Sequence, residues 1–178
     1  MTVQKLFAAP GVGLAIETET CYLYNRTGAV RNAGDIVMLD IADTDAGTDT
    51  STTEGASSSI LSNAILPTTA QMGAVSAAGA AQQQGTVFFI VAEDNVADDA
   101  LMKCVVEGAF VKASLVDSGT DITIGQCLYP INGSAQLTNL AAAAGQKCVA
   151  VAQEATAVTG LFKVWFSGRV GFGRHVVS

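Results

Sequence analysis

The seven residues Thr-Val-Phe-Phe-Ile-Val-Ala at positions 86–92 are the clearest strand signal in this 178-residue chain. β-Branched and aromatic side chains dominate the run, and no charge interrupts it, which is typical of a buried strand. The run Leu-Met-Lys-Cys-Val-Val-Glu-Gly-Ala-Phe-Val-Lys-Ala-Ser-Leu follows at 101–115. It predicts either a pair of strands or one strand bent around Gly108. These two runs predict a core built from β-structure.

Outward from this centre, shorter strand-like runs alternate with turn residues. Asn132-Gly133 is the strongest hairpin signal. Residues 94–99 suggest a short helical turn. Turn signals recur about every 8–12 residues, which favours an all-β fold, a small β-barrel or β-sandwich. The further predicted strands are residues 21–24, 35–41, 60–66, 122–129, 135–137, 147–153 and 161–170.

The composition supports the same class. The chain contains 29 Ala, 19 Val, 18 Gly and 17 Thr but only 12 Leu, so small and β-branched residues outweigh the usual helix formers. Only 14% of residues are charged and the net charge is −7. Disorder requires low hydrophobicity and a nucleic-acid binder requires a basic surface, so both are excluded. No apolar run is long enough for a transmembrane helix, so we expect no membrane contact.

Two parts of the chain lack regular patterning. Residues 1–20 contain Pro10-Gly11 and little periodicity, which predicts an extended N-terminal arm. Residues 21–178 are expected to form a single β domain. Within that domain, residues 42–59 are rich in Asp, Ser and Thr and predict a flexible acidic loop.

The acidic loop contains a weak calcium candidate. Asp43, Asp45, Asp49 and Glu54 fall at positions 1, 3, 7 and 12 of an EF-hand register. However, Gly47 occupies position 5, where a ligand belongs, and no amphipathic helix flanks the loop. A solvated acidic loop is therefore the stronger interpretation, and we expect no metal or other cofactor.

Catalytic signals are poor. His175 is the only histidine and lies three residues from the C-terminus, where a base is hard to position. Ser118, Ser134 and Ser167 lack a nucleophile-elbow setting. The acidic pairs Glu93-Asp94 and Asp98-Asp99 are typical of residues that cap a turn. We therefore expect no catalytic residue and no enzymatic activity.

The four cysteines match no metal-binding or redox motif. Cys21, Cys104, Cys127 and Cys148 are separated by 83, 23 and 21 residues. They are expected to be reduced thiols packed as small hydrophobic side chains, as in a protein made in the cytoplasm, with one disulfide possible in an oxidising compartment.

Charge is missing from two long segments. Residues 55–92 and 122–146 contain no Asp, Glu, Lys or Arg. Depletion of charge on a surface is a mark of interface cores, so these segments predict contacts with other subunits. A neutral surface without a partner is the alternative.

The order of the strand-like segments resembles that of the capsid decoration (cement) proteins of tailed bacteriophages. The resemblance covers residues 30–170, through Gly-Asp-Ile-Val-Met-Leu at 34–39 and the run at 85–92. It continues in Cys-Val-Val-Glu-Gly-Ala-Phe-Val-Lys-Ala at 104–113, the run at 122–129, Gly-Gln-Lys-Cys-Val-Ala-Val-Ala at 145–152 and Gly-Leu-Phe-Lys-Val-Trp-Phe at 160–166. It implies a compact β domain on the outer surface of an icosahedral head, and it assigns no individual contact residue.

The leading functional hypothesis is therefore a structural virion protein. It would be made in the host cytoplasm, bind the major capsid protein and other copies of itself as a dimer or trimer, and contact neither nucleic acid nor membrane. The alternative is a secreted or surface β domain that binds carbohydrate or calcium. A cysteine- or serine-based hydrolase has the least support.

Overall fold

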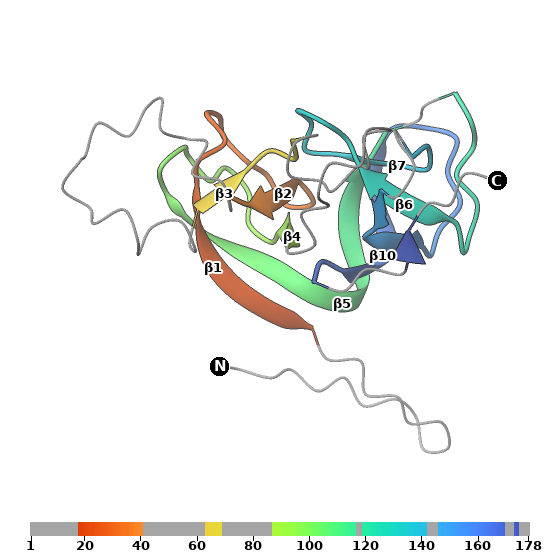
Figure 1. Ribbon diagram of the computed structural model, residues 1–178, viewed down its shortest axis with the longest axis horizontal. Helices are drawn as coiled ribbons and strands as arrows, with labels where there is room; N and C mark the ends of the chain where they lie inside the picture. Colours follow the sequence, from red (N-terminus) through yellow and green to blue (C-terminus); the bar gives the residue numbers. More distant parts are fainter. Residues whose placement is uncertain are drawn as a thin grey trace, which may run out of the picture.

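The computed structural model describes residues 18–40, 63–68, 87–116, 119–141, 146–169 and 173–174, and this part of the chain is all β (Figure 1). It confirms the predicted fold class. None of the described segments forms a helix that could span a membrane. The strands are β1 (Glu19–Asn25), β2 (Ile36–Leu39), β3 (Asn63–Ile65), β4 (Phe88–Val91), β5 (Leu101–Leu115), β6 (Cys127–Pro130), β7 (Leu137–Thr138), β8 (Lys147–Cys148), β9 (Ala150–Ala152), β10 (Gly160–Ser167) and β11 (Gly173–Arg174).

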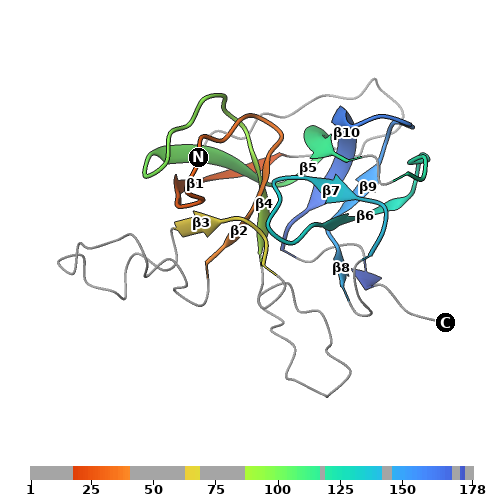
Figure 2. The ribbon, with the colours of Figure 1, turned by 90° about the horizontal axis from the view of Figure 1, so that it is seen from above.

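Nine strands form one large mixed sheet in the order β1-β3-β2-β4-β5-β10-β9-β6-β7, and β8 pairs with β11 separately. Further pairings join β1 to β5 and β5 to β7. The pairings therefore follow two rings that share β5: a first ring of β1–β5, and a second ring of β5, β6, β7, β9 and β10. Figures 1 and 2 show the two groups of strands on either side of β5. Of the two predicted architectures, a small β-barrel or a β-sandwich, a single closed barrel is not found among the described strands, because the long β5 serves both groups.

β5 reaches both rings because it is bent. Its register with β1 shifts beside Glu107, and its register with β10 shifts between Val164 and Phe166. Gly108 lies between these irregularities. A Cβ at Gly108 would come within 2.9 Å of the Val111 side chain and 3.1 Å of the Thr18 side chain, so any larger residue would force these neighbours to shift. The prediction of one strand bent around Gly108 is confirmed.

β2 and β4 are buried on both faces, which explains their uninterrupted apolar sequences. Ile36 and Phe88 belong to a core cluster that extends into the second ring. Their neighbours Val37 and Phe89 belong to a second cluster with Met102 inside the first ring. Since successive strand residues point to opposite faces, the strands separate two cores.

The two rings meet closely at Gly168. Its N–H donates to the carbonyl of Val106 at 3.0 Å, and its own carbonyl accepts from Phe88 N–H at 3.1 Å. A Cβ at Gly168 would lie 1.8 Å from the carbonyl oxygen of Phe88. Only glycine therefore allows the end of β10 to lie against β4.

Several local predictions can be compared with these strands. The Asn132-Gly133 hairpin is confirmed: Gly133 has φ +68°, and β6 and β7 pair antiparallel across the turn. Residues 94–99 form turns and a bridge rather than a helical turn. β1 begins at Glu19, so residues 19–20 belong to the sheet instead of the predicted arm. The rest of that arm up to residue 17, and the loop 42–59, lie outside the described residues.

The described parts of the two uncharged segments are partly core. Asn63–Ile65 and Phe88–Val91 are buried, and so are Leu128, Tyr129 and Leu137. At these residues the missing charge reflects burial of strands. Ile124 and Leu140 in the second segment are exposed, so contact of these segments with other subunits stays a prediction.

Candidate interaction surface

The sequence-predicted site residues are only partly within the described structure. Asp43, Asp45, Asp49 and Glu54 of the calcium candidate lie outside the described residues, as do His175 and Ser118. Over the described ranges, no three His, Cys, Asp or Glu side chains gather in a way that could hold a metal ion. Ser167 donates its hydroxyl hydrogen to Glu107 Oε1 at 3.0 Å, joining β10 to β5.

The acidic pairs at 93–99 stabilise turns, as their positions in the sequence suggested. Asp94 Oδ1 accepts the Ala33 N–H at 3.0 Å, and Asp98 Oδ1 accepts the Gly28 N–H at 2.9 Å. Asp99 forms an ion pair with Arg26, and Glu93 accepts the Lys103 N–H at 3.1 Å. These carboxylates link segment 93–99 mainly to segment 25–35. We call the two segments together the polar clasp.

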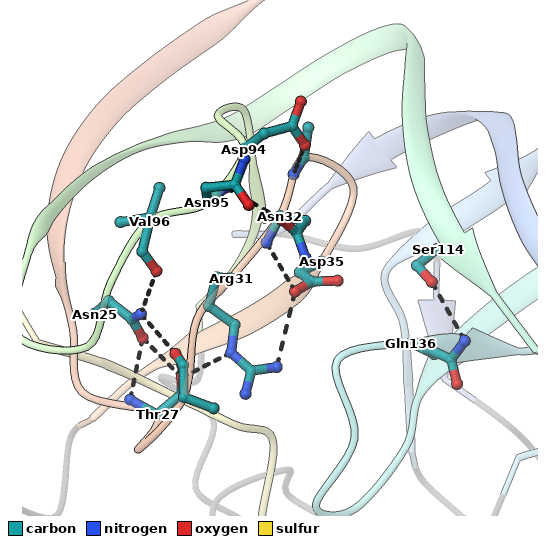
Figure 3. Close-up of polar contacts among 12 residues, drawn as sticks. Asn25, Thr27, Arg31, Asn32, Asp35, Asp94, Asn95, Val96, Ser114 and Gln136 are labelled. Carbon is teal, nitrogen blue, oxygen red and sulfur yellow. Dashed lines mark hydrogen bonds and ion pairs between the residues drawn. The ribbon is translucent and has the colours of Figure 1, made fainter.

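Asn25 lies at the centre of the polar clasp (Figure 3). Its side chain is fully buried, and its Nδ2 donates to the carbonyls of Ala29, Val96 and Ala97 at 2.9–3.1 Å. Its Oδ1 accepts from the Thr27 hydroxyl at 2.7 Å. One buried amide therefore links the end of β1 to Ala29 in the following turn and to Val96 and Ala97 in segment 93–99.

A different surface lies where β10 runs beside the last part of β5. Leu161, Lys163 and Trp165 alternate along β10 on its exposed side, and Lys163 lies directly opposite Lys112. Phe110 and Trp165 are 62% and 51% exposed. We call Phe110, Lys112, Leu161, Lys163 and Trp165 the Phe110–Trp165 face. Its apolar side chains are larger than those usually left scattered on a surface.

Phe110 is strained as well as exposed. Val164 pairs with Val111 and Phe166 with Gly108, so residues 109 and 110 lie opposite the single residue Trp165. This is a β-bulge, and within it Phe110 has φ +59°. Such a left-handed conformation is rare for a bulky side chain and costs about 1 kcal/mol or more. Its N–H donates to Gln153 Oε1 at 2.9 Å, which fixes the bulge.

The face also carries an unusual charge arrangement. Lys112 and Lys163 are like charges directly opposite each other, which disfavours the strand pair. Glu154 approaches Lys163 Nζ at 3.2 Å and accepts the Lys163 N–H at 3.0 Å. The N–H bond and the nearby ammonium groups hold the pKa of Glu154 below its usual value. One carboxylate thus stands beside two ammonium groups, so the face remains locally basic on an acidic protein.

Sequence reasoning did not single out this face. The available signal was the alternation Leu-Phe-Lys-Val-Trp-Phe within β10, which places Leu161, Lys163 and Trp165 on one side. The bulge at Phe110 had no sequence signal, because aromatic residues rarely adopt a left-handed conformation. A second exposed apolar patch, formed by Tyr22, Tyr24 and Leu101, lies where β1 pairs with the start of β5.

Comparison with known protein families finds no family model that matches this chain, and comparison with curated proteins finds no matching relative.

Proposed function

We propose that this protein is a structural subunit of a virion: a capsid decoration (cement) protein that binds the outer surface of an icosahedral phage head without catalysing a reaction. The proposal rests on the Phe110–Trp165 face. Its two aromatic residues are exposed, and Phe110 has a strained backbone conformation. Aromatic residues are enriched at protein interfaces and supply most hot spots. In this role the partner is the major capsid protein, and further copies of the chain are secondary partners.

The charge of the face narrows the partner's chemistry. Lys112 and Lys163 lie opposite each other, and Glu154 is the one carboxylate beside them among the described residues, so the face carries a net positive charge. A capsid surface that presents Asp or Glu beside an apolar patch would complement them. Repetition of such a contact over an icosahedral head makes modest individual affinities sufficient through multivalency. The overall charge of −7 suits the outside of a head better than its DNA-filled interior.

The proposal is tested with emptied phage heads assembled from a major capsid protein, beginning with any that is encoded next to this gene. Wild-type protein should sediment with the heads and should oligomerise at micromolar concentration in light scattering. Replacement of Trp165 by Ala should strongly reduce sedimentation, whereas the loop variant Val158→Ala, at a residue of similar exposure, should retain it. A stable monomer that does not bind heads would overturn the proposal.

A further inference from the structure

The four cysteines, far apart in the sequence, come together as two pairs. Cys21 on β1 lies directly opposite Cys104 on β5 in the antiparallel register. Residues paired in this way have Cα atoms about 4.5–5.5 Å apart and side chains on the same face of the sheet. A disulfide requires a Cα separation of about 4.4–6.8 Å. The backbone therefore already holds these two thiols at a distance that a disulfide can span.

The second pair joins β6 to β8. Beyond the effect of burial, the Cys127 side chain lies near enough to the Cys148 thiol to raise the pKa of that thiol, and Cys148 Sγ itself lies 3.3 Å from the Ala150 carbonyl. The backbone around them is fixed, because Leu128 pairs with Ala150 and the carbonyl of Leu128 accepts the Val149 N–H at 3.0 Å. All four cysteines are free thiols in this structure.

Each pair combines one accessible thiol with one buried thiol. Cys21 and Cys127 are half-buried, whereas Cys104 and Cys148 are buried in the apolar core. We propose that the pairs Cys21–Cys104, within the first ring, and Cys127–Cys148, between β6 of the second ring and β8, are latent disulfide sites, which close by exchange with a small-molecule disulfide of the glutathione type. This inference does not depend on the proposed function.

The arrangement sets the order of the reaction. The thiolate of the accessible cysteine attacks one sulfur of the small disulfide, forming a mixed disulfide and releasing one small thiolate. The buried cysteine then loses its proton, and its thiolate attacks the accessible sulfur. That step closes the protein disulfide and releases the second small thiolate. Two protein thiols are oxidised, one small disulfide is reduced to two thiols, and the two protons pass to the released thiolates.

Burial of Cys104 and Cys148 makes closure of the two disulfides slow at neutral pH, even when an oxidant is present. Desolvation in the core raises the pKa of Cys104 far above its usual value and raises the pKa of Cys148 to about 12. Few thiolates therefore exist at neutral pH, and the second step is slow. Closure links residues 83 and 21 positions apart in the chain, which restricts the unfolded chain and raises the melting temperature, more for the longer loop.

The test incubates fully reduced wild-type protein with oxidised glutathione, followed by intact-mass measurement and peptide mapping without reduction. We expect the folded monomer to lose two hydrogens for each pair and to yield two cross-linked peptides, one containing Cys21 and Cys104 and the other Cys127 and Cys148. The oxidised protein should melt several degrees higher, and a reducing agent should reverse the shift.

Single-site variants test the order within each pair. Cys104→Ser should trap glutathione on Cys21, and Cys148→Ser should trap it on Cys127, while the other pair still closes. The variant Cys21→Ser should prevent the first bond without trapping glutathione on Cys104. Cross-links between the two pairs, bonds between chains, or folded protein that stays reduced while urea-unfolded protein oxidises would overturn the proposal.

Discussion

The polar clasp and the Phe110–Trp165 face use the same unusual backbone conformation with opposite residue choices. In the clasp, left-handed φ angles fall on Gly28, Asn95 and Asp99, which are residue types that adopt this conformation at little cost. On the face, the left-handed residue is Phe110, whose ring is mostly exposed. Among the described residues it is the one bulky side chain with positive φ.

The residue choices in the polar clasp favour stability of the fold, whereas those on the Phe110–Trp165 face do not. In the clasp, the buried Asn25 amide and the N–H groups of Gly28 and Ala33 are hydrogen-bonded, and the turns carry suitable residues. On the face, strain, like charges and exposed aromatic rings lie within a few residues. Strain that folding does not require is concentrated at functional sites in many proteins. We infer that the face is kept for a partner, whereas the clasp is kept for the fold.

The largest effect on stability is expected from Asn25→Ala in the clasp. The substitution removes an amide, at a fully buried position, that bonds to the carbonyls of Ala29, Val96 and Ala97 and accepts from the Thr27 hydroxyl. The free energy of unfolding should fall by about 3 kcal/mol in urea denaturation. Gln136→Ala is the matched control, because Gln136 makes one half-exposed bond to Ser114 at 3.3 Å, and it should cost less than about 1 kcal/mol. Equal losses of unfolding free energy in the two variants would show that the Asn25 hydrogen bonds stabilise the fold no more than a half-exposed bond does.

The next effect concerns binding rather than stability. Trp165→Ala should weaken binding to phage heads by about 2 kcal/mol, or about 30-fold, because central aromatic residues dominate interface energies. Its unfolding free energy should fall by about 1–2 kcal/mol, since about half of the residue is buried. Val158→Ala, which removes an apolar side chain of similar exposure from a loop, should leave binding intact. Similar losses of head binding in both variants would show that the Phe110–Trp165 face is not the binding surface.

A smaller effect of opposite sign is expected from Phe110→Gly. Glycine adopts the positive φ of this bulge without strain, so the free energy of unfolding should rise by about 1 kcal/mol. Phe110→Asn should give part of this gain in unfolding free energy, because Asn adopts a left-handed conformation more readily than Phe. Guanidinium denaturation of wild type and the two variants measures the differences. A destabilised glycine variant would mean that the ring of Phe110 supports the fold.

The smallest effect is the pH dependence of the ion pair beside the face. The pKa of Glu154 is held below its usual value of 4.5, first by the Lys163 N–H. A carboxyl group with a lowered pKa stabilises the folded state above its unfolded pKa, and this contribution disappears as the pH falls through the folded pKa. The melting temperatures of wild type and Glu154→Gln should therefore differ slightly at pH 7 and converge once the pH lies below that lowered pKa. A difference that persists in acid would exclude this cause.

Local features of the fold could be predicted because neighbouring residues determine them. The bend at Gly108, the Asn132-Gly133 turn and the buried strand around Phe88 depend on backbone freedom and apolar runs. The uncharged segments were predicted to be surface because composition does not distinguish a neutral surface from a core. Their described parts contribute core residues such as Ile65 and Leu137.

Contacts between distant residues could not be predicted from one sequence. Asn25 reaches carbonyls more than 70 residues away, and Cys21 meets Cys104 only because β1 pairs with β5. The two-ring pairing likewise depends on which strands pair with β5 at each point along its length, and those strands are distant in the sequence. The Phe110–Trp165 face required the bulge, which sets Phe110 against Trp165 and has no local sequence signal.

The most direct test of the account is the head-binding affinity of Phe110→Gly, measured by cosedimentation on the same preparation used for denaturation. The account predicts a variant that is more stable than wild type yet binds heads at least about tenfold more weakly, because the strained ring contacts the partner. Wild-type affinity in a stabilised variant would contradict the claim that this strain serves a partner.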